Sequence, residues 1–209
     1  MNKRIKDILE WVYCIIIALV LALLFRYFIC NPTIVKQRSM FPTLKEGQRL
    51  ILNRTFRIKG YTPNRGDIIT FEAPSGDYEF GDYDQTNPIA KYDEEERNFI
   101  DNFVYYILEL SKKSYIKRVI GIPGDHVKIE EGKVFVNGKE LEEEYLEEDV
   151  ITESRVFNDI IVPEGYVFAL GDNRPKSTDC RLLGCIPLEK IEGIVVLRFW
   201  PFDVFGKIE

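Results

Sequence analysis

The sequence predicts a mainly β protein: an antiparallel β domain with a smaller, hairpin-rich elaboration, preceded by one N-terminal transmembrane helix. Three observations lead to this fold class. Residues 11–30 are apolar except for a few positions and hold one charge, Arg26. From Arg49 onward, short runs rich in β-branched and aromatic residues alternate with turn residues, as is typical of strands. The pair Asn137-Gly138 after one such run is the strongest local signal of a hairpin turn.

The apolar stretch is long enough to cross a bilayer. At a helical rise of about 1.5 Å per residue, residues 11–30 reach about 30 Å, which is the thickness of the hydrocarbon core. Trp11 and Tyr27 lie near its two ends, where aromatic side chains favour the membrane interface. We expect the Asn-Pro-Thr sequence at 31–33 to break the helix and an extended stretch to begin at Ile34.

A cleavable signal peptide is the alternative interpretation, because basic residues precede the apolar run at positions 3, 4 and 6. No Ala-x-Ala site follows the run, however, and the residues around Arg26 are bulky. We therefore expect an uncleaved anchor. Three basic residues precede the span and three lie within residues 27–46, so the positive-inside rule barely decides the orientation.

The charge of the remaining chain argues against nucleic acid as a partner. Residues 31–209 hold 24 basic and 32 acidic residues, a net charge of -8, whereas phosphate neutralisation needs clustered Lys and Arg. No Cys-x-x-Cys pair or His/Cys cluster indicates a metal site, and no cofactor is expected. A disulfide between Cys180 and Cys185 is left open by their spacing, and Cys14 and Cys30 are expected to be buried thiols.

Strands are expected along most of the domain, in residues 49–53, 67–71, 126–129, 133–136, 166–170 and 193–199, and in the run that ends at Pro123-Gly124-Asp125. Residues 72–113 break this pattern as an acidic insertion, with ten acidic and two basic residues between positions 77 and 109. Inside it, helical spacing predicts a short amphipathic helix docked on the core through Phe99, Phe103, Ile107 and Leu110. The six glutamates of residues 140–148 are expected to form a solvated face.

Ser39 is a candidate nucleophile. It lies in the sequence Arg-Ser-Met-Phe-Pro-Thr-Leu of residues 38–44, where a hydroxyl sits between an apolar residue and a turn that proline restricts. An ordinary strand that ends in a turn has the same composition, because Ser and Pro are common turn residues. The assignment therefore depends on a partner elsewhere in the chain.

Lys117 is the candidate partner. On a strand, Lys117 shares a face with Tyr115 and Val119 while Arg118 lies on the other, so one of the two cations must point toward the more buried side. Arginine stays charged almost anywhere, but a desolvated lysine loses its proton and becomes a base. That role needs the lysine pKa lowered from about 10.4 to near 7 or 8. His126 is expected to be an exposed hairpin residue rather than a triad base.

These two stretches, together with residues 65–71 and 171–181, resemble the type I signal peptidases of bacteria, membrane-anchored serine endopeptidases with a Ser/Lys dyad. The four blocks occur in the family's order, and the resemblance covers residue 31 to about residue 202. It implies a cytoplasmic N-terminus and anchor in residues 1–30 and an extracytoplasmic catalytic domain in residues 31–209. Residues 72–113 would be a variable insertion, and residues 126–165 a smaller non-catalytic β part.

The resemblance also implies the role of each site residue. Ser39 matches the nucleophile, Lys117 the general base, and Ser177 the serine that hydrogen-bonds and orients the lysine. Asp179 and Arg181 match a supporting ion pair. Apolar subsites that accept small P1 and P3 residues would include Val35, Met40, Leu44, Tyr115 and Ile116, for which core packing is the alternative.

Two positions depart from the family pattern. Gln37 stands where some members place a second serine as an oxyanion donor, so either its amide or the Ser39 backbone N–H alone would serve that purpose. Cys180 stands where the family often has a serine.

The resemblance implies a monomeric enzyme of the bacterial cytoplasmic membrane that removes signal peptides from exported preproteins after Ala-x-Ala-like sites, with the lipid bilayer as its second partner. A Ser/Lys self-processing protease is an alternative, but the kind fused to repressors would need an N-terminal DNA-binding domain. A membrane-tethered β-rich binding module without activity is another alternative, and it predicts that Ser39 and Lys117 can be replaced without loss.

Overall fold

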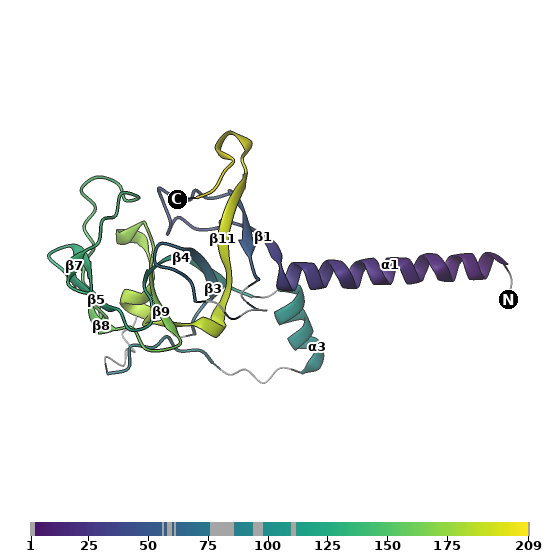
Figure 1. Ribbon diagram of the computed structural model, residues 1–209, viewed down its shortest axis with the longest axis horizontal. Helices are drawn as coiled ribbons and strands as arrows, with labels where there is room; N and C mark the ends of the chain where they lie inside the picture. Colours follow the sequence, from purple (N-terminus) through teal and green to yellow (C-terminus); the bar gives the residue numbers. More distant parts are fainter. Residues whose placement is uncertain are drawn as a thin grey trace.

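The computed structural model describes residues 3–55, 57, 60, 62–75, 86–93, 98–109 and 112–208. Figure 1 shows a long N-terminal helix, α1, that projects from a domain built mainly of strands. In this described part of the chain, the strands form one seven-stranded and one four-stranded sheet, and every strand pairing is antiparallel. The predicted fold class is therefore confirmed.

Helix α1 (Lys3–Phe28) contains the predicted span, and residues 4–28 are long and apolar enough to cross a membrane. Its apolar side chains are exposed rather than packed on the domain. The predicted boundary was wrong, because the helix ends at Phe28 and strand β1 (Cys30–Ile34) already contains Pro32. β1 lies at the edge of its sheet, where a proline that cannot donate a ladder hydrogen bond is tolerated.

The seven-stranded sheet carries the predicted site. Its strands are, in spatial order, β1, β2 (Arg49–Asn53), β11 (Ile191–Trp200), β3 (Ile68–Glu72), β4 (Ser114–Gly121), β9 (Tyr166–Leu170) and β10 (Ile186–Pro187). β4 lies between β3 and β9, with Lys117 opposite Ile69 and Arg118 opposite Leu170. Lys117 is thus held near the middle of the sheet, where strands flank it on both sides.

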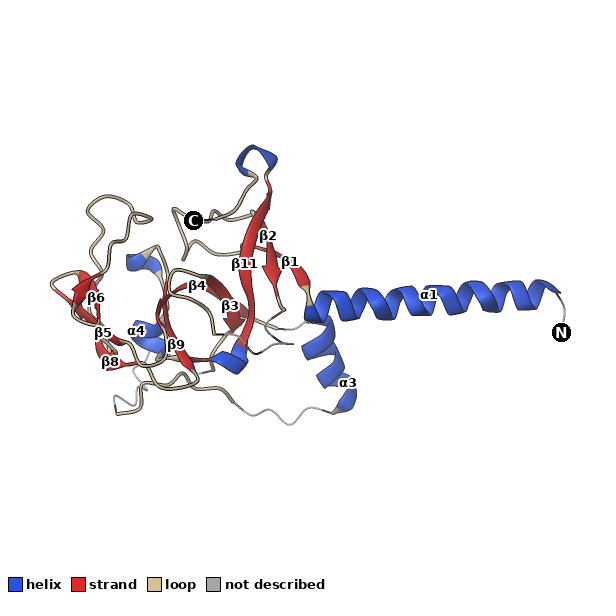
Figure 2. Ribbon diagram, in the orientation of Figure 1, coloured by secondary structure: helices blue, strands red, loops and turns tan. Residues whose placement is uncertain are grey.

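The four-stranded sheet is the predicted hairpin-rich part. Its order is β7 (Lys139–Glu140), β6 (Lys133–Val136), β5 (His126–Glu130) and β8 (Asp159–Ile161). Asn137 and Gly138 have φ values of 54° and 78° at the turn between β6 and β7, as a type I′ hairpin requires. His126 is exposed on this sheet, as predicted, with its Nε2 2.6 Å from Asp159 Oδ1. Figure 2 shows this sheet at the end of the molecule away from α1.

The larger hydrophobic core joins the two sheets. Val119 and Phe168 of the seven-stranded sheet belong to the same buried cluster as Val127 and Val134 of the four-stranded sheet. Gly121 permits this close packing, because a Cβ atom on it would lie 2.6 Å from a methyl group of Val127. The core therefore connects strand β4, which carries Lys117, directly to the hairpin-rich part.

The amphipathic helix of the insertion forms, but it does not dock as predicted. A turn of α-helix, α3 (Phe99–Asn102), continues into the π-helical segment η1 (Phe103–Leu108), beside the end of α1 (Figure 1). Phe99 is 86% exposed and Phe103 is exposed as well, Ile107 is half-buried, and Leu110 lies outside the described residues. Polar contacts hold the segment instead: the Tyr105 hydroxyl donates to Glu72 at 2.9 Å.

A polar cluster at Glu109 joins the insertion to the anchor. Glu109 accepts hydrogen bonds from Arg54 and Asn31, at 3.0 and 3.1 Å, and Arg54 is 2% exposed. Arg26, near the end of α1, donates to Asn31 Oδ1 and to the Leu108 carbonyl oxygen, both at 3.0 Å. These side-chain contacts therefore restrain the direction in which α1 leaves the domain.

The cysteines are free thiols in this structure. Cys180 and Cys185 are buried and unlinked, whereas Cys14 is exposed on α1 and Cys30 is half-buried, contrary to the expectation that both would be buried. Cys14 is exposed because α1 projects from the domain as a single helix (Figure 1).

Candidate active site

The side chains of Lys117 and Ser39 meet although they come from different parts of the chain. Ser39 lies in the turn after β1, and the Lys117 Nζ donates a hydrogen bond to its Oγ at 2.9 Å. The same Nζ donates to the Ile116 carbonyl oxygen at 3.0 Å. Lys117 is 1% exposed and Ser39 is 6% exposed. The two functional groups are therefore in direct contact and shielded from water.

Burial lowers the pKa of Lys117 from its ordinary value of 10.5 to about 8. The carboxylates of Asp179 and Asp172 and the Cys180 thiol act in the opposite direction, and Arg181 adds to the lowering. Desolvation prevails because the ammonium group has no carboxylate in direct contact among the described residues. A substantial fraction of Lys117 is thus neutral near pH 8, the form that accepts a proton.

Arg118, the next residue on β4, differs from Lys117 because a carboxylate neutralises its charge. The sequence predicted that one of the two cations would be buried, but both are, and Arg118 is 3% exposed. Asp172 compensates the Arg118 charge, with Nε–Oδ1 and Nη2–Oδ2 distances of 3.1 and 2.9 Å. Thr43 adds a hydrogen bond to Asp172 at 2.6 Å, and the guanidinium lies 3.9 Å from the centre of the Tyr145 ring.

The loop after β9 holds the Ser39 backbone in place. The Asn173 N–H donates to the Ser39 carbonyl oxygen and its side-chain amide donates to the Arg38 carbonyl oxygen, both at 3.0 Å. Gly171 must be a glycine, since a Cβ atom would lie 2.5 Å from the Ser39 oxygen and 2.2 Å from Ser177 Oγ. No separate role was expected for Asp172 or Asn173, although both follow Gly171 directly after a predicted strand.

Asp179 and Arg181 form the predicted ion pair, at 2.8 Å, and both side chains are fully buried. Burial alone would raise the pKa of Asp179, but the hydrogen bond and charge of Arg181 bring it below its ordinary value. Asp179 also accepts the Gly171 N–H at 3.1 Å, and Arg181 donates to the Arg174 carbonyl oxygen at 2.6 Å. The pair therefore supports both ends of the loop that holds Ser39.

Ser177 does not make the hydrogen bond expected for it. Its side chain is buried and makes no hydrogen bond to Lys117, but it lies close enough to Asp179 to lower the pKa of that carboxyl. It also packs against Gly171. In this structure, Lys117 is thus oriented by Ser39 and by the Ile116 carbonyl oxygen.

Glu143 was expected on a solvated face, and this expectation was wrong. Arg174 is fully buried and donates to both Glu143 carboxylate oxygens, to Thr152 Oγ1 at 2.6 Å and to the Gly171 carbonyl oxygen at 3.0 Å. A buried guanidinium needs a counter-charge, and the glutamate-rich segment supplies it. This contact links the hairpin-rich part to the Gly171 loop.

The predicted apolar subsite residues fall into two groups. Val35, Met40 and Leu44 are buried together in one cluster, against which Ile116 also packs. Tyr115 and Ile116 are half-buried on β4 next to Lys117, and Lys117 Nζ lies 5.2 Å from the centre of the Tyr115 ring. Of these residues, Tyr115 and Ile116 present the most surface to an incoming chain.

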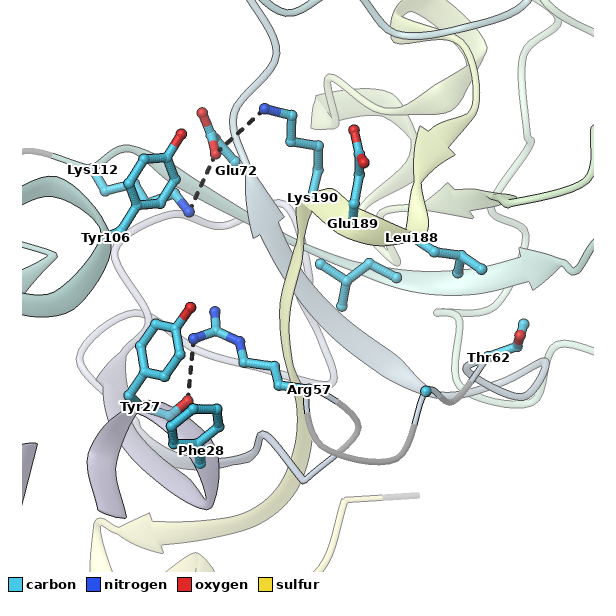
Figure 3. Close-up of a pocket in the computed structure, with 12 residues that line it drawn as sticks. Tyr27, Phe28, Arg57, Thr62, Glu72, Tyr106, Lys112, Leu188, Glu189 and Lys190 are labelled. Carbon is cyan, nitrogen blue, oxygen red and sulfur yellow. Dashed lines mark hydrogen bonds and ion pairs between the residues drawn. The ribbon is translucent and has the colours of Figure 1, made fainter. Parts of the chain in front are cut away.

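Two hydrogen-bond donors belong to Ser39 and to Gln37, two positions before it. Gln37 is exposed, and in the described part of the chain neither its side-chain amide nor the Ser39 backbone N–H makes a hydrogen bond. Both are therefore available to a negatively charged oxygen. A separate hollow of about 840 Å³, shown in Figure 3, lies between the end of α1, η1 and the start of β11, and neither Ser39 nor Lys117 lines it.

Comparisons with known proteins show the relatives of this chain. The family described as signal peptidase, peptidase S26, matches residues 8–200. Signal peptidase I of Bacillus licheniformis is 34% identical over 216 residues, which cover 100% of this chain and 96% of that protein. Signal peptidase IB of Staphylococcus aureus strain COL is 32% identical over 218 residues, covering 96% and 93%. A signal peptidase I structure from Enterococcus faecalis V583 aligns at 26% identity over 64% of this chain and 97% of that one, with a TM-score of 0.38.

Proposed function

The chain belongs to the signal peptidase family, peptidase S26, and from this premise we propose that it cleaves signal peptides from exported preproteins with a Ser39/Lys117 dyad. The observation that carries the proposal is the 2.9 Å contact between Lys117 Nζ and Ser39 Oγ, made inside a dry site. A serine hydroxyl is a weak nucleophile until an adjacent base takes its proton. A buried lysine with a pKa of about 8 meets this requirement.

In the proposed reaction, neutral Lys117 accepts the Ser39 proton while Oγ attacks the carbonyl carbon of the scissile bond. The carbonyl oxygen becomes negatively charged and accepts hydrogen bonds from the Ser39 backbone N–H and the Gln37 amide. The protonated Nζ then gives its proton to the leaving amine, and the C–N bond breaks to leave an ester on Ser39. Lys117 next takes a proton from water, which attacks the ester and releases the product.

The surrounding buried charges keep this geometry in place. Asn173 holds the Ser39 carbonyl, and the Asp179–Arg181 pair holds Gly171, so the nucleophile is positioned by groups that take no proton themselves. Prepositioned groups reduce the entropic part of the barrier. We assign Ser177 to the same supporting shell, through its packing on Gly171.

Substrate and location follow from the same premise. Tyr115 and Ile116 would line shallow subsites for small P1 and P3 side chains, with Val35, Met40 and Leu44 supporting them from beneath, which suits an Ala-x-Ala-like site. We place residues 1–30 in the cytoplasmic membrane and on its cytoplasmic side, and residues 31–209 on its outer face. The protein would act as a monomer. The apolar, exposed surface of α1 supports the membrane anchor.

The test is cleavage of a peptide that spans an Ala-x-Ala signal junction by the detergent-purified protein. Ser39→Ala and Lys117→Ala should abolish cleavage while the circular dichroism spectrum stays unchanged. His126→Ala is the matched control, because His126 is exposed and bonds Asp159 outside the site. If the unaltered protein is inert, or if either dyad variant still cleaves, the dyad is refuted and a membrane-tethered binding module becomes the better interpretation.

A further inference from the structure

The pocket of Figure 3 lies where α1 meets the domain. Tyr27 and Phe28, the last two residues of α1, form one wall, and Tyr106 of η1 forms another. Lipid head groups lie immediately outside the hydrocarbon core of a bilayer. With α1 in a membrane, as the proposed function requires, this pocket of about 840 Å³ is at head-group depth.

Arg57 is the cation of this pocket that makes no direct ion pair with a described carboxylate, although the charges of Glu109 and Glu192 act to raise its pKa. Its Nη1 donates to the Tyr27 carbonyl oxygen at 3.1 Å, and its guanidinium lies 4.6 Å from the centre of the Tyr27 ring. Burial, followed by the charge of neighbouring Arg54, lowers the pKa of Arg57 below its ordinary value. Lys112 differs, because its Nζ lies 3.2 Å from Glu72. An anion in the pocket would therefore be stabilised at Arg57.

The rest of the pocket narrows the class of anion. A guanidinium suits phosphate oxygens because its N–H groups form a planar fork. Glu72 and Glu189 lie across the pocket from Arg57 (Figure 3). Glu72 is already paired with Lys112 and Lys190, so Glu189 is the lining carboxylate that makes no ion pair among the described residues. These charges oppose a ligand with several negative charges. They are compatible with one phosphate that is balanced by an amine. Tyr27 and Phe28 supply apolar surface on the side of the span.

We propose that this pocket binds the head group of a membrane phospholipid that bears an amine, with its phosphodiester at Arg57. The acyl chains would then run beside the exposed apolar side chains of α1, including Leu24 and Phe25. The pocket is also lined by Ile191, at the start of β11. A bound lipid therefore bridges the anchor and the catalytic sheet.

Binding is measured by isothermal titration of the full-length protein in a maltoside detergent with dihexanoylphosphatidylethanolamine. We expect saturable binding that Arg57→Gln weakens about tenfold or more, as for loss of a hydrogen bond to a charged group. Arg49→Gln removes the same charge on β2, where Arg49 faces the Trp200 ring at 5.9 Å and does not line the pocket, so it should leave binding unchanged. Arg57→Lys, which keeps the charge, should retain part of the affinity.

Further ligands separate the possible sources of the phosphate. Dihexanoylglycerol, inorganic phosphate and dihexanoylphosphatidylglycerol should each bind more weakly than the ethanolamine lipid. Equal binding of dihexanoylglycerol or inorganic phosphate, or equal affinity of the Arg57→Gln protein at unchanged melting temperature, would overturn the proposal. Tighter binding of the glycerol lipid would overturn the preference for an amine. No substrate is present in these titrations, so the result is independent of peptidase activity. Whether α1 spans the membrane is tested separately, by protease protection of α1 in vesicles.

Discussion

Lys117 Nζ lies 2.9 Å from Ser39 Oγ, although the two residues are 78 positions apart in the chain. β4 presents the amine, and its own Ile116 carbonyl oxygen restrains that amine at 3.0 Å. The loop after β9 presents the serine, through two hydrogen bonds from Asn173. Three separate segments thus determine one contact, and the consequences of that contact are measurable.

The first prediction concerns pH. Because burial lowers the pKa of Lys117 to about 8, the base is protonated and inactive at lower pH and neutral at higher pH. We expect kcat/KM for a signal-junction peptide to rise with pH through about 8 and then to level off. A series of initial rates between about pH 6 and 10 measures this. A rise centred on the ordinary lysine value of 10.5 would contradict the assignment.

The second prediction concerns the decrease in the free energy of unfolding that results from burying Lys117. The unfolded chain recovers the ordinary lysine pKa of 10.5, so between pH 8 and 10.5 it binds more protons than the folded protein. The free energy of unfolding should therefore rise with pH across that window. Below that window, the full destabilisation caused by burying Lys117 is present. That cost is roughly 3 kcal/mol, at about 1.36 kcal/mol per unit of pKa.

Lys117→Met keeps the stem of the side chain and removes the amine. We expect this variant to lose all cleavage and to gain about 2 to 3 kcal/mol in urea unfolding at neutral pH. Lys139→Met, on the exposed strand β7, is the matched control and should unfold as the unaltered protein does. A Lys117→Met variant that is less stable than the original would show that the amine stabilises the fold.

The third prediction concerns the buried pair of Arg118 and Asp172. Asp172→Asn leaves a guanidinium that is 3% exposed without its counter-charge. We expect a loss of about 3 to 5 kcal/mol in the free energy of unfolding. Adding Arg118→Gln should recover part of this loss, because the unpaired charge is then gone.

Glu140→Gln provides the comparison, since it breaks the exposed pair with Lys133 and should cost less than about 1 kcal/mol. Equal losses for Asp172→Asn and Glu140→Gln would mean that water reaches the Arg118 site.

The fourth prediction concerns the junction of anchor and domain. Glu109→Gln weakens the cluster in which Glu109 bonds Arg54 and Asn31, while Arg26 bonds Asn31 and Leu108. We expect cleavage of a vesicle-inserted preprotein to fall several-fold more than cleavage of a soluble peptide. The physical reason is that the direction of α1 relative to the site is then less restrained.

Rates with both substrates, compared as a ratio, test this prediction. Glu148→Gln is the control, because Glu148 is exposed on the loop after β7. If the ratio is the same for Glu109→Gln and for the unaltered protein, the cluster does not position the site on the membrane.

Local sequence pattern was sufficient to predict several of the helices and strands, but not the end of α1 or the bounds of β1. The span of α1, strands β2 and β6 and the Asn137-Gly138 turn were all predicted, because hydrophobic period and turn residues act over a few neighbouring positions. The contact between Ser39 and Lys117 was anticipated through the family resemblance and the strand pattern. The free state of Cys180 and Cys185 was left open, since spacing does not determine a disulfide.

The sequence by itself determined a membrane-length helix, a set of antiparallel strands and a serine with a distant lysine. Only the tertiary structure decided that Arg118 is neutralised by Asp172 and that Glu143 leaves solvent to pair with Arg174. It also decided that Phe99 stays exposed while Glu109 anchors the insertion. The reason is that a buried charge needs a partner, and that partner can come from any part of the chain that folding brings within about 3 Å.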